Sequence, residues 1–338
     1  MSRKRFTIWL AAFTGAVEGI LLLLPGAHSA SAQAQFKTTT QLVLTPVRVT
    51  DHLGKTVDGL KADDFELFEN GKLRKFELES TFEPVSLVVA VQTSGISGPA
   101  LAKIRKIGGL IQPLIVGDQG AGAVLTFSDQ VRVRQDFTDD PAKIGAAFRA
   151  IEPDGSGAAM HQAIAEGVRM LAARETTRRR VLIVIGEARD RSSKIALEEV
   201  ITRAQAANVV IYPVSYSATW TSFTSKGGEQ FDSGKSVYPS GGGMDLIAVF
   251  REIARTGNQN GHQALAEYTG GMRSSFVKLK GLEEALQRAG EDLHSQYLLS
   301  FRASPIEDSH AYRWIQVRVR TCPDCAIRHR PGYWRDGD

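Results

Sequence analysis

The sequence predicts an α/β fold, in which a small β module precedes a doubly wound, mostly parallel sheet. After residue 84, continuous apolar runs of strand length alternate with stretches of helical periodicity. This pattern is typical of parallel strands that helices cover on both faces. Before that point, Asn70-Gly71 separates two strand-like segments, and both residues tolerate the positive φ angles of a type I′ turn. With 43% apolar residues, the 338-residue chain can bury a core of this size.

The first thirty-odd residues have the features of a secretory signal peptide. Three basic residues at positions 3–5 precede a mostly apolar run from Phe6 to Leu24, and a small-x-small pattern ends at Ala32. The alternative is an uncleaved membrane anchor, but Glu18 interrupts the run and no basic stop-transfer flank follows it. We expect residues 1–32 to be removed, which leaves an exported chain, periplasmic or extracellular, without a membrane span.

The charge of the chain does not favour nucleic acid as a partner. Lysine and arginine number 41 against 37 acidic residues, which gives +4. The leader takes three positive charges and one negative charge with it, so the mature chain carries +2. No long block of one sign is present that could follow a phosphate backbone. We therefore expect no nucleic acid partner, and for an exported binding module we expect a protein partner rather than a small molecule.

Residues 36–83 are expected to form the small β module. The segment from Gln41 to Thr50 is rich in β-branched residues and ends at a polar turn. Two further segments, 64–69 and 72–78, flank the Asn70-Gly71 turn and predict a hairpin. A module this short needs additional strands to be stable.

Residues 84–303 are expected to form the α/β domain. Within it, residues 217–243 are rich in Ser and Gly and lack periodicity, which predicts a long exposed insertion. An alternating segment at 131–135 predicts an antiparallel edge strand with one wet face. The other predicted strands lie at 86–91, 121–127, 181–185 and 209–214, and the predicted helices at 100–115, 159–173, 193–207, 245–256, 262–269 and 282–293.

Residues 304–338 are expected to form a C-terminal β extension. Strand-like segments at 296–301 and 312–320 need partners, as do the open edges of the N-terminal module, so we expect them to pair with each other. The chain has two cysteines, Cys322 and Cys325, too few for a disulfide framework or a complete zinc site. An oxidising compartment favours a disulfide between them.

In a doubly wound sheet, ligands usually meet the loops that leave the carboxyl ends of the strands. Three such loops can be recognised, at residues 91–97, 154–159 and 185–188. The polar side chains that they offer as a binding face are those of Gln92, Ser94, Ser97, Ser156 and Glu187.

The order of these loops resembles that of the von Willebrand factor type A domain. The phrases "VTDHLGKTVDGLKADDFELFENG", "FSDQVRVRQDFTDD", "EYTGG" and "LHSQYLLSF" are similar to those of bacterial exported proteins that place this domain behind a short β module. The resemblance covers roughly residues 40–335 and implies a Rossmann-like sheet.

The resemblance also implies a degenerate metal-ion-dependent adhesion site. In the family, Asp-x-Ser-x-Ser, a Thr and an Asp on the three loops hold a divalent cation. The matching positions here are Gln92, Ser94, Ile96, Ala158 and Glu187, so only Ser94 is kept and Glu187 is a longer acid. Magnesium and calcium require hard oxygen ligands, which Ile96 and Ala158 do not offer. We expect no metal and no cofactor.

These features predict an exported, non-enzymatic protein-binding or assembly module that works without a metal. The alternative is an extracytoplasmic hydrolase or a thiol-disulfide protein that uses the strand-end face or the cysteine pair. Ser94, His161 and Asp190 could be nominated for catalysis, but the residues around Ser94 do not form a G-x-S-x-G elbow. Strand-like residues precede Cys322, whereas a thioredoxin-type cysteine begins a helix. We therefore expect no enzymatic activity.

Overall fold

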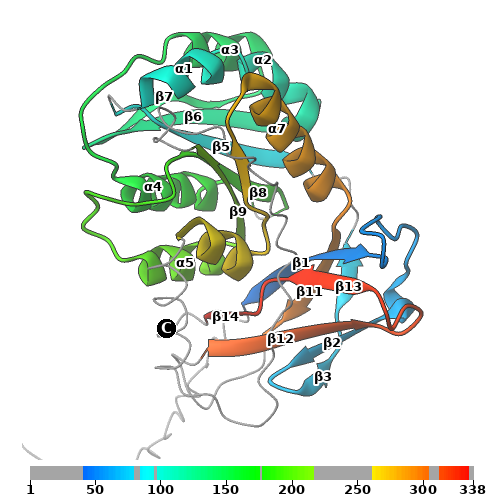
Figure 1. The fold of residues 1–338 in the computed structure, drawn as a ribbon. Helices are drawn as coiled ribbons and strands as arrows, with labels where there is room; N and C mark the ends of the chain where they lie inside the picture. Colours follow the sequence, from blue (N-terminus) through cyan, green and yellow to red (C-terminus); the bar gives the residue numbers. More distant parts are fainter. Residues whose placement is uncertain are drawn as a thin grey trace, which may run out of the picture. The chain divides into compact units, whose positions relative to one another are not determined.

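The structure is a computed structural model that describes residues 41–79, 84–94, 97–175, 177–216, 261–303 and 312–334 (Figure 1). The predicted signal peptide at 1–32, the insertion at 217–243 and the helix at 245–256 lie outside these ranges. Within the described residues, no helix has the length and apolar character needed to cross a bilayer.

The central sheet has the strand order β10-β9-β8-β5-β6-β7. The four apolar runs predicted as parallel strands are confirmed, since β9, β8, β5 and β6 pair in parallel. All residues of β5, β6 and β8 are buried, as expected for strands covered on both faces. The parallel strands are β5 (Val85–Gln92), β6 (Ala121–Phe127), β8 (Arg179–Gly186), β9 (Val209–Tyr216) and the short, unpredicted β10 (Ser274–Phe276).

β7 (Val131–Thr138) is the antiparallel edge strand that its alternating sequence predicts. It pairs with β6 alone within the sheet. Most of its side chains are exposed or half-buried, including Val133 at 49% exposure. The sequence therefore identified the position of this strand, but the expected single wet face is wrong, because no residue of β7 is buried and the apolar Val133 is exposed as well.

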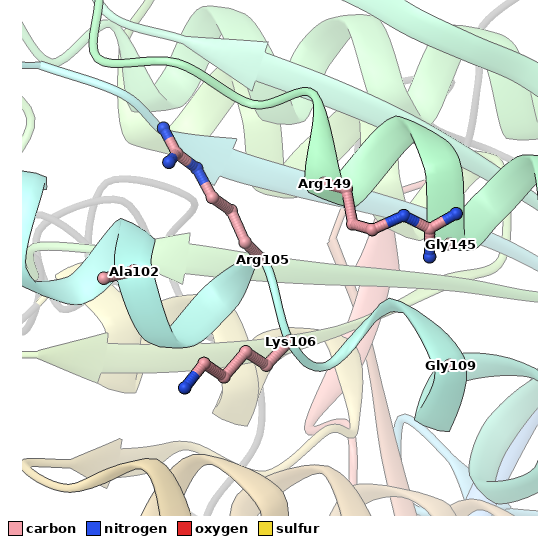
Figure 2. Close-up of a pocket in the computed structure, with 6 residues that line it drawn as sticks. All are labelled: Ala102, Arg105, Lys106, Gly109, Gly145 and Arg149. Carbon is pink, nitrogen blue, oxygen red and sulfur yellow. The ribbon is translucent and has the colours of Figure 1, made fainter.

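The single helix predicted at 100–115 is wrong, because the chain breaks there into three short pieces: α1 (Gly98–Ile104), α2 (Gly108–Ile111) and the π-helical turn η3 (Gln112–Val116). The first break spans residues 105–107, and Figure 2 shows it at Arg105 and Lys106. Gly108 is pressed against the next helix, since a Cβ on Gly108 would lie 2.8 Å from the Cβ of Phe148. That close approach is a tertiary constraint that helical periodicity does not reveal.

The neighbouring helix, α3 (Pro141–Arg149), was not predicted. The side chain of Asp140 caps it by accepting the N–H of Ala142 at 2.8 Å, and Pro141 occupies the first turn. An acidic cap followed by proline is a common start signal of a helix. The sequence therefore contained the signal, although the helix is only nine residues long.

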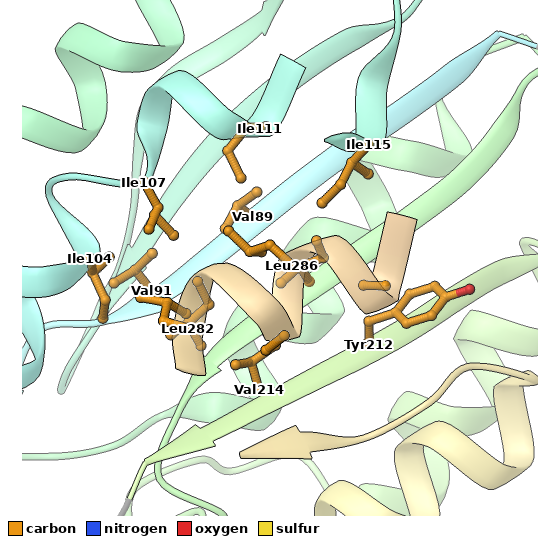
Figure 3. Packing of buried hydrophobic residues seen from close by; sticks show 14 of the residues in the cluster. Val89, Val91, Ile104, Ile107, Ile111, Ile115, Tyr212, Val214, Leu282 and Leu286 are labelled. Carbon is orange, nitrogen blue, oxygen red and sulfur yellow. The ribbon is translucent and has the colours of Figure 1, made fainter. Parts of the chain in front are cut away.

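Helices cover both faces of the central sheet. Alternate residues of β5 face opposite layers, so Val89 and Val91 pack with α1–α3 and α7, while Val88 and Ala90 pack with α4 and α5. Figure 3 shows the first of these layers, in which Leu282 and Leu286 lie close to the sheet strands. The remaining helices are α4 (Met160–Ala172), α5 (Leu197–Ala206), residues 261–269 and α7 (Leu279–His294).

Two four-stranded sheets make up the β module, with orders β13-β1-β11-β4 and β14-β12-β2-β3. The predicted pairing of C-terminal strands with the N-terminal module is confirmed, because β1 lies between β11 and β13, and β12 pairs with β2. The domain boundaries remain predictions. The strands are β1 (Leu42–Thr50), β2 (Phe65–Glu69), β3 (Lys72–Arg74), β4 (Glu77–Glu79), β11 (Tyr297–Arg302), β12 (Tyr312–Val319), β13 (Ala326–His329) and β14 (Gly332–Trp334), and a 3₁₀ turn, η1 (Ala62–Asp64), precedes β2.

The Asn70-Gly71 hairpin forms with both residues at positive φ, 48° and 76°. Its second strand is shorter than the predicted segment 72–78, because the chain leaves the hairpin after Arg74. β4 then pairs with β11 in the other sheet. The predicted segment 72–78 therefore contributes strands to two different sheets, and no residue pattern within it indicates this change.

Cys322 and Cys325 are joined by a disulfide, as predicted. The pair lies in the turn between β12 and β13, where both residues pack against the apolar core of the module. The bridge closes a loop of only a few residues, so its main effect is to hold this turn.

A buried carboxylate, Asp292 of α7, connects the module to the α/β domain. Its Oδ2 accepts hydrogen bonds from the Tyr212 hydroxyl at 2.9 Å and from Gln296 Nε2 at 2.8 Å. Its Oδ1 pairs with Arg328 of β13, and Arg48 of β1 approaches it at 4.0 Å. Burial raises the pKa of Tyr212 well above its ordinary value, and the charge of Asp292 adds to this, so the hydroxyl remains a donor.

We predict that Asp292→Ala lowers the free energy of unfolding by about 2–4 kcal/mol, because it leaves Arg328 and the Tyr212 hydroxyl without their shared acceptor. Urea denaturation measures the loss. Glu291→Ala, one residue away on the exposed side of α7, is the control and should change the value by less than about 0.5 kcal/mol. If the two substitutions lower the free energy of unfolding equally, the hydrogen bonds and ion pairs of Asp292 do not stabilise the contact between the module and the α/β domain.

Candidate functional site

The side chain of Gln92 joins the ends of two neighbouring parallel strands. Gln92 ends β5, and its Oε1 accepts the N–H of Glu187, which follows β8, at 2.8 Å. Its Nε2 donates to Ser94 Oγ at 2.8 Å and to Glu187 Oε2 at 3.3 Å. Gly186 leaves room for this amide, since a Cβ on Gly186 would lie 2.9 Å from Gln92 Oε1. The amide thus ties the first strand-end loop to the third.

The carboxylate of Glu187 is balanced by a guanidinium from its own loop. The Glu187 side chain is 9% exposed, and its Oε2 forms an ion pair with Arg191, four residues later. The Arg191 side chain is 46% exposed, so one part of it faces the buried acid while another part reaches solvent. A buried carboxylate needs such compensation because its desolvation is costly.

A second chain of hydrogen bonds continues from Ser94. Its Oγ lies 3.3 Å from Ser97 Oγ, and the Tyr216 hydroxyl donates to Ser97 Oγ at 2.6 Å. Burial raises the pKa of Tyr216 to about 12, while the hydrogen bond to Ser97 opposes that rise. The end of β9 is therefore linked to the first loop by neutral hydroxyl groups.

The second loop folds over Asp129, which follows β6. One carboxylate oxygen of Asp129 accepts the N–H of Ser156 at 2.9 Å. The backbone N–H groups of Ser156 and Gly157 hold the pKa of Asp129 below its ordinary value. Gly155 has φ +67°, and a Cβ on Gly155 or Gly157 would lie within 2.4 Å of an Asp129 oxygen. The glycines allow the backbone to wrap the acid this closely.

The third loop caps the start of α4, which has no capping side chain of its own. Asp190 Oδ2 accepts the N–H of His161 at 2.8 Å, and the hydroxyls of Ser192 and Ser193 accept the N–H groups of Ala158 and Gln162. The bonds to His161 and Gln162 satisfy backbone donors that the first turn of a helix leaves free, and the bond to Ala158 holds the residue just before the helix cap. The loop and the helix therefore form one hydrogen-bonded unit.

The five predicted binding-face residues divide into two groups. Gln92, Ser94, Ser97 and Glu187 are buried, between 0% and 7% exposed, and belong to one network. Ser156 lies apart on the exposed second loop. Contact of these residues with a partner stays a prediction. Ile96 falls outside the described residues.

The residues nominated for catalysis do not form a hydrogen-bonded triad in the described part of the chain. Ser94 contacts Gln92 and Ser97, whereas His161 Nδ1 lies 3.1 Å from the carbonyl oxygen of Ile195 and 3.9 Å from Asp190 Oδ2. No hydrogen bond joins Ser94 to His161 among these residues. His161 and Asp190 instead serve the third-loop cap of α4.

Residues 88–230 match the family model of the von Willebrand factor type A domain. This part of the chain is a von Willebrand factor type A domain. The match includes the strands from β5 to β9 and the three strand-end loops described above. The α/β fold with a mostly parallel sheet agrees with this membership.

Several solved structures resemble the chain at 13% sequence identity. An aerotolerance-related membrane protein from Bacteroides fragilis aligns with a TM-score of 0.43 over 61% of this chain and 98% of its own. BatB from Bacteroides thetaiotaomicron aligns with a TM-score of 0.41 over 62% and 98%. A von Willebrand factor type A protein from Catenulispora acidiphila aligns with a TM-score of 0.44 over 76% and 52%. No curated protein gives a significant match.

The residues at the adhesion-site positions of this von Willebrand factor type A domain do not fit a divalent cation. The amide nitrogen of Gln92 donates to Glu187 Oε2 and the guanidinium of Arg191 pairs with the same oxygen, so a neutral donor and a cation of the protein already occupy it. Ala158 offers no side-chain oxygen. Within the described ranges, no three His, Cys, Asp or Glu side chains form a group that could hold a metal ion.

Sequence reasoning did not identify Arg191 or Asp129. Arg191 lies four residues after Glu187, a spacing that signals an ion pair only within a helix, and this segment is a loop. Asp129 lies within the phrase that carries the family resemblance, but its contact with the second loop spans 27 residues. Both roles depend on loop geometry that local patterns do not encode.

We predict that Arg191→Ala destabilises the domain by about 1–2 kcal/mol, since Glu187 loses its counter-charge, although water screens part of that charge. The loss should largely disappear in a Glu187→Gln background, where no charge needs compensation. Thermal and urea unfolding of the single and double variants measure this coupling. Arg189→Ala, in the same loop and exposed, is the control. If Arg191→Ala costs the same with and without Glu187, the pair does not balance the buried charge.

Proposed function

We propose that the chain is an exported, non-enzymatic protein-binding or assembly module whose strand-end face works without a metal ion. The observation that carries the proposal is the ion pair between Arg191 and the buried Glu187. A guanidinium is charged at every physiological pH, so it balances the acid permanently. The acid then has no need of a divalent cation from solution.

The hydrogen bonds between the loops support a role in binding. Gln92 joins the first loop to the third, the third loop caps α4, and the second loop is held by Asp129. Loops fixed in this way lose little conformational entropy when a partner docks. Arg132 of β7 and Asp154 of the second loop form an ion pair with side chains 45% and 36% exposed, and they add charged groups to this face. Domains of this family are generally interaction modules.

The disulfide supports a location outside the cytoplasm. Bonds between cysteines persist in oxidising compartments and are rare where glutathione keeps thiols reduced. Cys322 and Cys325 are bonded, and the sequence before residue 33 has the features of a signal peptide. The exported location rests on these two features together.

The described residues offer no constellation that supports the alternative function, hydrolysis or thiol-disulfide exchange. A hydrolase needs a nucleophile within hydrogen-bond reach of its base. The hydroxyl group of Ser94 forms its hydrogen bonds with the amide of Gln92 and the hydroxyl of Ser97, neither of which is a base. The cysteines lie in a turn between strands, not at the start of a helix.

A pull-down from envelope extract tests the proposal. We expect the mature protein to recover a stoichiometric partner equally well in EDTA and in magnesium, because the face holds its own cation. Hydrolase and disulfide-exchange assays on the same protein should remain at background. Loss of the partner in EDTA, with recovery on adding magnesium, would contradict metal independence. Turnover in the assays without any recovered partner would favour the alternative function.

Restoring the family ligands should create a metal site. We predict that Gln92→Asp, Ile96→Ser, Ala158→Thr and Glu187→Asp, combined with Arg191→Ala to remove the competing cation, give calorimetrically measurable magnesium binding. The same four substitutions with Arg191 retained should bind magnesium at least about tenfold more weakly, because a guanidinium beside the site repels it. The unmodified protein should show no binding. A single magnesium site in the unmodified protein that Glu187→Ala abolishes would overturn our interpretation.

A further inference from the structure

Three short helical segments and α3, all on one side of the sheet, carry basic residues and no acids, whereas α7 on the same side carries four acids. Residues 98–116, which form α1, α2 and η3, contain three basic residues, and α3 contains two. Neither segment contains an Asp or a Glu, although acids are nearly as frequent as bases in the whole chain. The basic residues are Lys103, Arg105, Lys106, Lys143 and Arg149.

A hollow of about 520 Å³ lies between these helices (Figure 2). This volume is within the range of about 300–1,000 Å³ that is common for ligand sites. Small residues leave the space open, and a Cβ on Gly109 would meet no atom within 4 Å. The lining residues are Ala102, Arg105, Lys106, Gly109, Gly145 and Arg149.

Two of the three charges around the hollow are uncompensated. Arg105 is held in place by the carbonyl oxygen of Ile151 at 2.6 Å and by Glu152 at 3.0 Å. Lys106 and Arg149 are exposed, and no carboxylate in the described part of the chain pairs with either. The hollow is therefore electropositive, with one fixed cation and two that can turn toward a ligand.

We propose that this hollow binds an acidic segment of a partner polypeptide. Figure 2 shows Arg105 and Lys106 leaving the end of α1 in different directions and Arg149 on α3 across the hollow. Charges spread in this way suit several carboxylates along an extended chain better than a single phosphate. Three cations are also few for a nucleic acid, where specific complexes commonly neutralise about 6–10 phosphates. This surface is separate from the strand-end face and does not depend on its proposed function.

Anisotropy of a short fluorescein-labelled peptide of alternating Glu and Ser, titrated with the mature protein at low ionic strength, tests the proposal. Lys106→Glu with Arg149→Glu should weaken binding at least about tenfold, because both mobile cations become repulsive. Lys72→Glu with Lys75→Glu makes the same change in net charge on exposed lysines of the β module and should weaken binding less than about threefold. Gly109→Leu fills the hollow without changing charge, and it should also weaken binding.

Circular dichroism and the melting temperature confirm that each variant is folded. The proposal is overturned if the unmodified protein does not bind the peptide, or if the two double variants weaken binding equally. It is also overturned if phosphatidylglycerol vesicles or a single-stranded oligonucleotide bind through Lys106 and Arg149 while the peptide does not. Full binding by Gly109→Leu would exclude the hollow as the place where the peptide lies.

Discussion

The buried amide of Gln92 imposes the arrangement on which the strand-end face depends. Every polar atom of this side chain has a partner, and those partners belong to two different loops. An unsatisfied buried polar group costs about 1–3 kcal/mol, so a movement of either loop away from Gln92 is opposed. This arrangement also requires glycine at position 186, because a side chain there would displace the Gln92 amide.

Charge balance at this face is local. In the Glu187 pair, acid and base come from one short loop, so the loop carries its own counter-ion. A covalently attached cation cannot dissociate, and its effective concentration does not depend on the ionic composition of the surroundings. Charge balance at Asp292 is not local. Its cations come from β1 and β13, so the cluster connects segments that are distant in the sequence.

Sequence patterns predicted the elements that are determined by residue type and spacing within one short segment. The apolar strands, the β7 edge and the Asn70-Gly71 turn follow from residue type and spacing, and all are present. The break at Gly108 and the crossing of β4 depend on contacts with Phe148 and β11, which no local window contains. At the site, the three loops could be predicted from strand ends. The role of Arg191 could not, since it depends on how a loop without regular structure folds.

The interlocked strands of the β module have a consequence for how the chain folds. The Tyr297 hydroxyl donates to the carbonyl oxygen of Val57 across 240 residues, and β1 has both of its neighbours in the C-terminal third of the sequence. At about 5–20 residues per second, ribosomal synthesis separates these segments by roughly 10–50 s. Throughout that interval β1 and β2 have unpaired edges, which are sites for wrong pairing. The module therefore closes only after β11, β12 and β13 have been synthesised and can pair with β1 and β2.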